Sequence, residues 1–410
     1  MGSSGRGDRV PVEAQHDPFV HAGEGVLTLR LLPVVSFTFV AYLCIGLPLA
    51  ILPTYVHRTF GASVLLAGLL VSLQYIATFA SRPYAGHMSD RTSPKRVVIQ
   101  GLVACLGSGL LMAAAALLVH LPWVSLTTIA LSRLALGYGE SMTSTAAMMW
   151  GIGRIGAANT SKAIAWNGIA TYTALAIGAP LGAFLEPHFG FVSVGAAVLL
   201  VSSAALVTAM RLGATPAIKA ERVPLRSILS GVLPYGMALA IGGLGFGVIA
   251  TFITLYFYHL NWQGASVSLT IYGTSFVVTR LLFVGMIDRF GGYRVAAASF
   301  LVEAIGLVVL AVPHRSLAFV GCGLIGMGFS LVFPALGVEV ANAFPASVRG
   351  SVLGIYCSFV DFSLFVAGPI AGAVIGAYGY GAVFTSTAVA ILLTMFGTVW
   401  LGWSKLRATP

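Results

Sequence analysis

Long apolar segments, each followed by a short polar segment or a turn, repeat along the chain from Leu31 to Leu401. Each contains a window of about twenty residues without a central charge, long enough to cross the roughly 30 Å hydrocarbon core of a bilayer. Because this core offers backbone amides no water to bond with, the segments must be helices. The pattern therefore predicts an all-α integral membrane protein.

We predict twelve transmembrane helices, several of them separated by turn residues such as Gly291-Gly292 and Gly379. The predicted ranges are 30–56, 63–86, 96–119, 122–150, 161–185, 190–211, 228–258, 265–287, 293–312, 316–342, 350–377 and 380–404. One long polar stretch between helices, from Arg211 to Arg226, falls midway and predicts a linker. The expected organisation is a cytoplasmic tail (1–25), a six-helix bundle (26–211), a cytoplasmic linker (212–227), a second six-helix bundle (228–404) and a cytoplasmic tail (405–410).

The distribution of basic residues supports this number of helices. With the N-terminus inside, 17 of the 22 Lys and Arg residues fall on the cytoplasmic side, whereas Arg58 and Arg315 fall outside and Arg82, Arg133 and Arg280 fall within helices. The net charge of +10 thus reflects membrane topology and not nucleic-acid binding. A content of 58% hydrophobic and 8% charged residues excludes a soluble protein. We expect a multi-pass protein of the bacterial inner membrane with both termini cytoplasmic.

Internal repeats relate the two halves. Arg82 precedes Asp90 by eight positions, and Arg280 precedes Asp288 by eight. Further matches join the fourth helix to the tenth and the fifth to the eleventh: Gly137-Tyr138-Gly139 with Gly326-Met327-Gly328, and Ala179-Pro180 with Gly368-Pro369. Six plus six helices with internal repeats are typical of transporters that bind substrate between two rocking halves.

Some of these residues also resemble a known family. Gly86-His87-Met88-Ser89-Asp90-Arg91, followed by Lys95-Arg96, resembles the loop 2–3 signature of the major facilitator superfamily. Arg133, Gly137 and Gly139 resemble the helix-4 signature of its proton-coupled members. Pro180 and Pro369 lie where its drug/proton antiporter (efflux) branch carries a Gly-Pro motif, although Ala179 leaves that motif intact only in the eleventh helix. The resemblance implies two pseudo-symmetric six-helix bundles around a central cavity.

Ionisable residues inside the predicted helices are the first functional candidates, because charge within a bilayer is costly. Arg133 and Glu140 lie seven residues apart and share a helix face, about 10 Å from each other. A carboxyl group near a guanidinium in an apolar setting could bind a proton in one conformation and release it in another. We expect proton coupling at Glu140 or Asp361 with Arg133 taking part, a helix contact at Glu303, and a gate or interfacial contact at Glu339.

Two further groups of candidates depend on the resemblance. In the family, the loop acidic and basic residues lock the halves together on the cytoplasmic side, which assigns gating to Asp90, Arg91, Asp288 and Arg289. The fold places four neutral polar residues around the cavity: Tyr42, Gln74, Asn167 and Tyr272. Together with Arg133, Glu140 and Asp361 they are the substrate-binding candidates, although each could equally serve as a contact between helices.

The sequence contains no nucleotide-binding loop or hydrolase motif, and its four cysteines show no disulfide or metal spacing. We therefore expect no enzyme, no cofactor and no metal. The predicted function is a monomeric secondary active transporter whose partners are protons, a small-molecule substrate and the lipid bilayer, working most simply as a proton-coupled exporter. Two alternatives remain: proton-coupled uptake of a sugar or organic anion, and a receptor that binds ligand without moving it.

Overall fold

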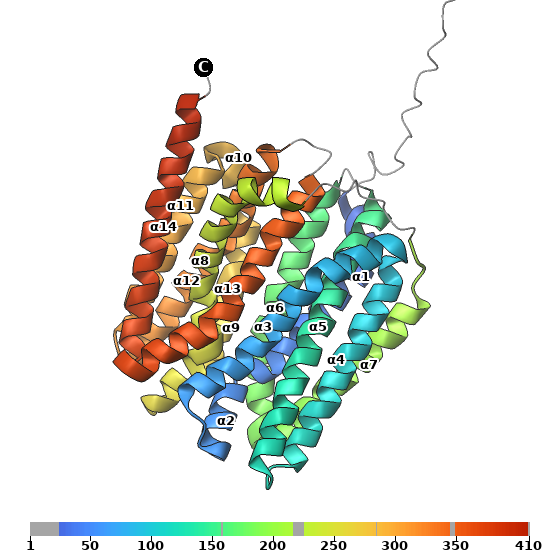
Figure 1. Cartoon of the computed structure of the whole chain (residues 1–410), viewed down its shortest axis with the longest axis vertical. Helices are drawn as coiled ribbons and strands as arrows, with labels where there is room; N and C mark the ends of the chain where they lie inside the picture. The colour runs from blue at the N-terminus through green and yellow to red at the C-terminus, as the bar shows by residue number, and fades with distance from the viewer. Residues whose placement is uncertain (1–23, 157–158, 216–224, 284, 345–348, 409–410) are drawn as a thin grey trace, which may run out of the picture.

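The computed structural model describes residues 24–156, 159–215, 225–283, 285–344 and 349–408, and every regular element in these ranges is a helix (Figure 1). The helices of the first half are α1 (Glu24–Leu49), α2 (Leu52–Phe60), α3 (Val64–Arg91), α4 (Pro94–Leu117), α5 (Pro122–Ile155), α6 (Thr160–Phe189) and α7 (Phe191–Arg211). Those of the second half are α8 (Leu225–His259), α9 (Ala265–Phe283), α10 (Met286–Phe290), α11 (Gly292–Ala311), α12 (Arg315–Asn342), α13 (Arg349–Tyr378) and α14 (Tyr380–Ala408).

Apart from the short α2 and α10, the described part of the chain thus holds the twelve long helices that the sequence predicts. Eleven of the spans it contains are long and apolar enough to cross a membrane. The remaining long helix, α5, has a mean hydropathy too low to count as such a span, because Arg133, Glu140 and a series of serines and threonines interrupt its apolar residues. The all-α membrane fold class is therefore confirmed.

Two predicted helices are broken in the structure. The first, expected over 30–56, ends at Leu49, and α2 begins at Leu52 with Pro53 in its first turn. Proline lacks an amide hydrogen and suits the start of a helix, which explains the break there. The eighth, expected over 265–287, ends as α9 at Phe283, and α10 follows from Met286. The predicted tail at 1–23, most of the linker (216–224) and residues 409–410 lie outside the described residues.

The two halves share their internal packing, as the sequence repeats predict. A Cβ atom on Gly137 of α5 would collide with the carbonyl oxygen of Gln74 on α3. In the second half, a Cβ on Gly326 of α12 would collide with the carbonyl oxygen of Tyr272 on α9. Only glycine allows such a close backbone approach. The two glycine repeats therefore form the same kind of helix contact at equivalent positions in the two halves.

A second equivalent contact uses different chemistry. The hydroxyl groups of Ser108 on α4 and Ser132 on α5 lie 3.1 Å apart. At the corresponding place in the second half, Gly306 of α11 and Gly321 of α12 approach so closely that a Cβ on either would lie within 2.9 Å of the other's carbonyl oxygen. The repeat therefore preserves the position of a close helix crossing while its side chains differ.

The halves meet chiefly along two helix pairs, α3 with α13 and α6 with α9, and α2 and α3 also contact α8. The C-terminal end of α14 lies at the top of Figure 1 and α2 lies at the bottom; we call these ends of the bundle the terminal side and the distal side. Near the distal side, α3 and α13 touch closely, because a Cβ on Gly368 would collide with Gly68 and Ser72. These contacts close the seam between α3 and α13 on the distal side.

Toward the terminal side the same two helices separate. Gly86 lies 18 residues after Gly68, about five turns, and therefore on the same face of α3. A Cβ on Gly86, or on Gly354 of α13, would nevertheless meet no atom of a neighbouring element within 4 Å in the described part of the chain. The seam between α3 and α13 is thus packed on the distal side and open on the terminal side.

Candidate functional site

An ion pair joins the two halves near the middle of the seam. Arg82 of α3 donates two hydrogen bonds to Asp361 of α13, one from Nε to Oδ2 and one from Nη2 to Oδ1 at 2.8 Å. The same Nη2 atom lies 3.7 Å from Oε1 of Glu140 on α5. Arg82, Glu140 and Asp361, which we call the Arg82 cluster, therefore place one guanidinium against two carboxyl groups from different halves.

Hydroxyl groups hold Glu140 in position. Thr78, one turn before Arg82 on α3, donates a hydrogen bond to its Oε2 at 2.9 Å. Ser144, one turn after Glu140 on α5, donates to its Oε1 at 2.9 Å. Tyr42 of α1 also lies beside this carboxyl group. Because each carboxyl oxygen of Glu140 has a donor, its orientation toward Arg82 is fixed.

The cluster is buried but borders the open part of the seam. The side chains of Glu140 and Asp361 are 3% and 7% exposed, whereas that of Arg82 is 18% exposed. With both carboxyl groups ionised, the cluster carries a net charge of −1, and one added proton makes it neutral. A buried net charge of this kind is costly.

The structure corrects the partner that the sequence assigns to Glu140. Arg133 shares a helix with Glu140, yet the guanidinium within 4 Å of Glu140 belongs to Arg82. Arg133 is fully buried, and its three guanidinium nitrogens have no hydrogen-bond partner among the described residues. Its main electrostatic neighbour is Tyr75 of α3. Two turns of helix place Arg133 too far toward the distal side to reach the cluster.

The neutral candidates occupy different surroundings. Tyr42 borders the Arg82 cluster. Asn167 of α6 accepts a 2.6 Å hydrogen bond from Thr38 of α1, a contact within the first half. Gln74 and Tyr272, which are equivalent in the repeat, are both buried, and their side-chain polar atoms find no partner in the described part of the chain.

The remaining ionisable candidates lie away from the cluster. Glu339 accepts a 2.9 Å hydrogen bond from the backbone amide of Gly292, so it makes an interfacial contact at the start of α11. Glu303 is fully buried beside Gly245 of α8 and Gly328 of α12, and neither carboxyl oxygen has a hydrogen-bond partner among the described residues. Glu303 thus contacts two neighbouring helices by packing, without a hydrogen bond to the described residues.

The gating candidates lie on the terminal side. Arg91, Asp288 and Arg289 are exposed, and the Arg289 guanidinium lies 5.2 Å from the ring centre of Phe290. The side chain of Asp90 falls outside the described part of the structure. These positions fit the open terminal end of the seam, where the two halves are apart.

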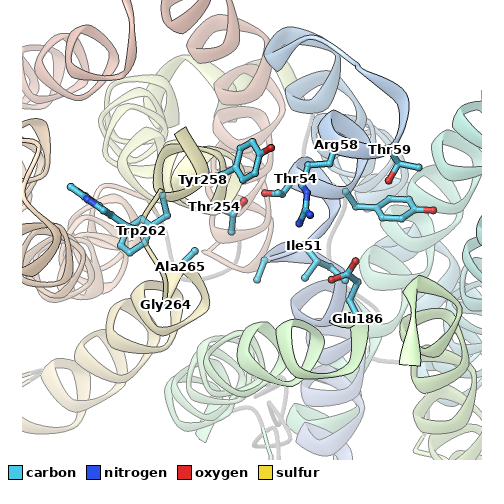
Figure 2. A pocket seen from close by; sticks show the side chains of 13 residues that line it. Ile51, Thr54, Arg58, Thr59, Glu186, Thr254, Tyr258, Trp262, Gly264 and Ala265 are labelled. Carbon is cyan, nitrogen blue, oxygen red and sulfur yellow. The ribbon is translucent and has the colours of Figure 1, made fainter. Parts of the chain in front are cut away.

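A separate pocket of about 460 Å³ opens between the halves on the distal side (Figure 2). Thr54 and Arg58 line it from the first half and Thr254, Tyr258 and Trp262 from the second. Glu186 of α6 points toward the same space as Arg58 (Figure 2). None of the residues predicted from the sequence lies here, so this pocket is distinct from the Arg82 cluster.

Sequence reasoning missed Arg82, Thr78 and Ser144 as members of the site. Arg82 was noted only as a repeat residue inside a helix, eight positions before Asp90. The available signal was spacing: Thr78 lies four residues before Arg82, and Ser144 four residues after Glu140, so each pair shares a helix face.

No group of three potential metal ligands converges in the part of the chain that the structure describes.

Comparison with known proteins places these features in context. The sequence model of the Major Facilitator Superfamily matches residues 34–263 and 235–410. An uncharacterized MFS-type transporter of Burkholderia pseudomallei (strain 1106a) is 48% identical over 366 residues, which cover 88% of this chain and 89% of the relative.

Two solved structures share the fold at low sequence identity. The human organic anion transporter MFSD10 (TETRAN) is 16% identical with a TM-score of 0.71, covering 91% of this chain and 99% of its own. The xylose transporter XylE from E. coli, in an inward-open conformation, is 14% identical with a TM-score of 0.74, covering 90% and 95%.

Proposed function

Since this chain belongs to the major facilitator superfamily and is a multi-pass membrane transporter, we propose that it exports small organic molecules in exchange for protons. The Arg82 cluster is the proposed coupling site. A proton bound at Asp361 or Glu140 drives the change between two conformations, and a substrate is carried between the halves in the opposite direction. We further propose that both termini and the linker at 212–227 lie in the cytoplasm. The bundles 26–211 and 228–404 then move as two units within a monomeric transporter.

The observation that carries this proposal is the bond between Arg82 and Asp361 across the two halves. Protonation of Asp361 removes its negative charge and weakens the attraction to Arg82. Arg82 then has Glu140, 3.7 Å away in its own half, as its remaining ionic partner. A proton thereby changes how strongly the halves are held together, and this is the physical link that coupling requires.

The charge pattern supports an assignment of sides. The terminal side carries most of the basic residues, as cytoplasmic surfaces do. The seam opens on that side near Gly86 and Gly354, which corresponds to a cytoplasm-facing state. Asp90, Arg91, Asp288 and Arg289 are then proposed to close this end in the opposite state, when the distal contacts separate.

A second candidate is proton-coupled uptake of a sugar or an organic anion. Arg133 and Arg280 favour it, because both guanidinium groups are buried and neither has a carboxylate within 4 Å among the described residues. Direction is tested in cells that express the chain: they would exclude a labelled compound under the export proposal and accumulate it under the uptake proposal.

The test of coupling is proton release when ligands are added to the purified protein. The panel contains a cationic dye, a neutral sugar and an organic acid, with Glu140→Gln and Asp361→Asn beside the wild type. We expect release with an active ligand that disappears in at least one variant. Normal pH-driven transport by both single variants, at normal expression, would refute the assignment of the cluster.

A further inference from the structure

We propose that the transported substrate carries an anionic group that binds Arg280, beside an aromatic cluster formed by both halves. This inference rests on the proposed function only in assuming that substrate passes between the halves. Its chemical class is a small organic anion, such as a carboxylate or a phosphonate, with a flat apolar body.

The first step is an asymmetry between equivalent residues. Arg82 on α3 and Arg280 on α9 occupy the same position in the repeat, as do Gln74 and Tyr272 two turns away. Arg82 contacts two carboxyl groups, Glu140 and Asp361. Arg280 has none within 4 Å in the described part of the chain. Arg82 therefore has one counter-charge from each half, whereas its equivalent Arg280 has none among the described residues.

The second step is that Arg280 is buried without a carboxylate partner among the described residues. Arg280 is 7% exposed, its Nη2 donates to the backbone carbonyl of Ser330, and its Nε has no partner among the described residues. Its guanidinium lies 4.8 Å from the ring centre of Phe276. A carbonyl and a ring stabilise a cation far less than a carboxylate does, so a buried anionic ligand would gain a strong, charge-assisted interaction here.

The third step is the surface beside Arg280. The ring of Tyr172, from the first half, stacks on Phe276 with centres 3.5 Å apart. Phe246 stacks on Tyr272 at 5.0 Å, and Tyr172 lies 5.9 Å from Phe246. The buried hydroxyl of Tyr272 has no partner in the described residues. The rings pack on one another and form an apolar aromatic wall beside Arg280, of which Tyr172 is the partly exposed member. Such a wall suits an anion with an apolar body.

The fourth step connects this place to the proton site. Tyr172 is an electrostatic neighbour of both Arg280 and Asp361, and it lies on the α6 face that packs against α9. Gly168, one turn before Tyr172, leaves space for the guanidinium: a Cβ there would lie 2.7 Å from Nη1 of Arg280. The anion site, at the α6–α9 contact, and the Arg82 cluster, at the α3–α13 contact, therefore share Tyr172 as an electrostatic neighbour.

The experiment uses three probes with the same ring and different charges: benzoate, benzamide and benzylammonium, with phenylphosphonate as a second anion. Binding to the full-length protein in lipid nanodiscs is measured by calorimetry at neutral pH. We expect an anion to bind at least about tenfold more tightly than benzamide, the ratio for one charged hydrogen bond. Arg280→Gln should abolish that preference, Arg280→Lys should retain part of it, and Arg315→Gln, outside the seam, should leave it unchanged.

Several outcomes would overturn the inference: equal affinity for all three charges, an unchanged preference in a folded Arg280→Gln protein, or no binding of either anion up to its solubility limit. If Arg280→Gln does not fold, the comparison is made with Arg280→Lys and Gly168→Ala, which should each weaken the anion preference. Anion binding without proton release would refute the proposed proton coupling and leave this inference standing. Proton release caused only by benzylammonium or a sugar would refute this inference and leave the proposed proton coupling standing.

Discussion

Arg82 and Asp361 lie 279 residues apart in the sequence and form a two-point ion pair that joins the halves of the transporter. Glu140 stands 3.7 Å from the same guanidinium. One cation therefore serves two carboxyl groups, of which one belongs to its own half and one to the other. This arrangement makes the strength of the connection between the halves depend on protonation.

The first prediction concerns the energy of this pair. Arg82→Gln and Asp361→Asn should each lower the free energy of unfolding, because each leaves a buried charge without its best partner. The double variant should lose less than the sum, by a coupling energy of about 1–3 kcal/mol. Unfolding in mixed detergent micelles measures it. The matched control combines Arg82→Gln with Asp288→Asn, which makes no ion pair with Arg82; there the effects should add.

The second prediction concerns the seam glycines. Gly368→Ala should lower thermal stability and slow transport, since its methyl group would collide with Ser72 and Gly68 across the halves. Overpacking of this kind costs about 1–3 kcal/mol. Gly86→Ala and Gly354→Ala, on the same two helices, should have little effect because their methyl groups meet open space. Equal effects at all three positions would contradict the seam as described.

The third prediction tests the internal repeat. Gly137→Ala and Gly326→Ala should destabilise the protein to a similar extent, because each methyl group would collide with the carbonyl oxygen of the equivalent residue, Gln74 or Tyr272. Gly107→Ala is the control, since nothing lies within 4 Å of a Cβ there. Melting temperatures in detergent provide the comparison. A large loss in one half alone would show that the repeats do not pack equivalently.

The fourth prediction concerns access to the cluster. Cys357 lies one turn from Asp361 on α13 and is half-buried, whereas Cys44, Cys105 and Cys322 are buried. A membrane-impermeant maleimide should label Cys357 from the terminal side and label the other three slowly. Inside-out and right-side-out vesicles separate the two sides, and Cys357→Ser identifies the site. Labelling of Cys357 from the distal side only would contradict an opening on the terminal side.

Hydrophobic pattern and charge were enough to predict the number of long helices, because membrane hydrocarbon permits few alternatives. The glycine repeats at Gly137 and Gly326, which the sequence shows only as a similarity between halves, lie at equivalent helix contacts in the structure. The breaks after Leu49 and Phe283 were not predicted, since an apolar pattern continues through them. Pro53 was a visible signal for the first break.

The composition of the site was less accessible to the sequence. Spacing along one helix suggested Arg133 as the neighbour of Glu140, whereas the guanidinium that reaches it comes from another helix, at Arg82. Such a contact depends on how α3, α5 and α13 cross, and a single sequence does not contain that information. Asp361 was identified because an acidic residue in an apolar helix is unusual, but its partner could not be.

The most direct measurement is the distance between spin labels at Gly86→Cys and Gly354→Cys, on a cysteine-free background, by electron paramagnetic resonance. Both positions have open space and lie on opposite sides of the terminal opening. The distance distribution should change between mildly acidic and mildly alkaline buffer, and Asp361→Asn should fix it in one form at every pH. A distribution in Asp361→Asn that keeps the full pH response of the parent protein would contradict the proposal that the Arg82 cluster couples protons to the movement of the halves.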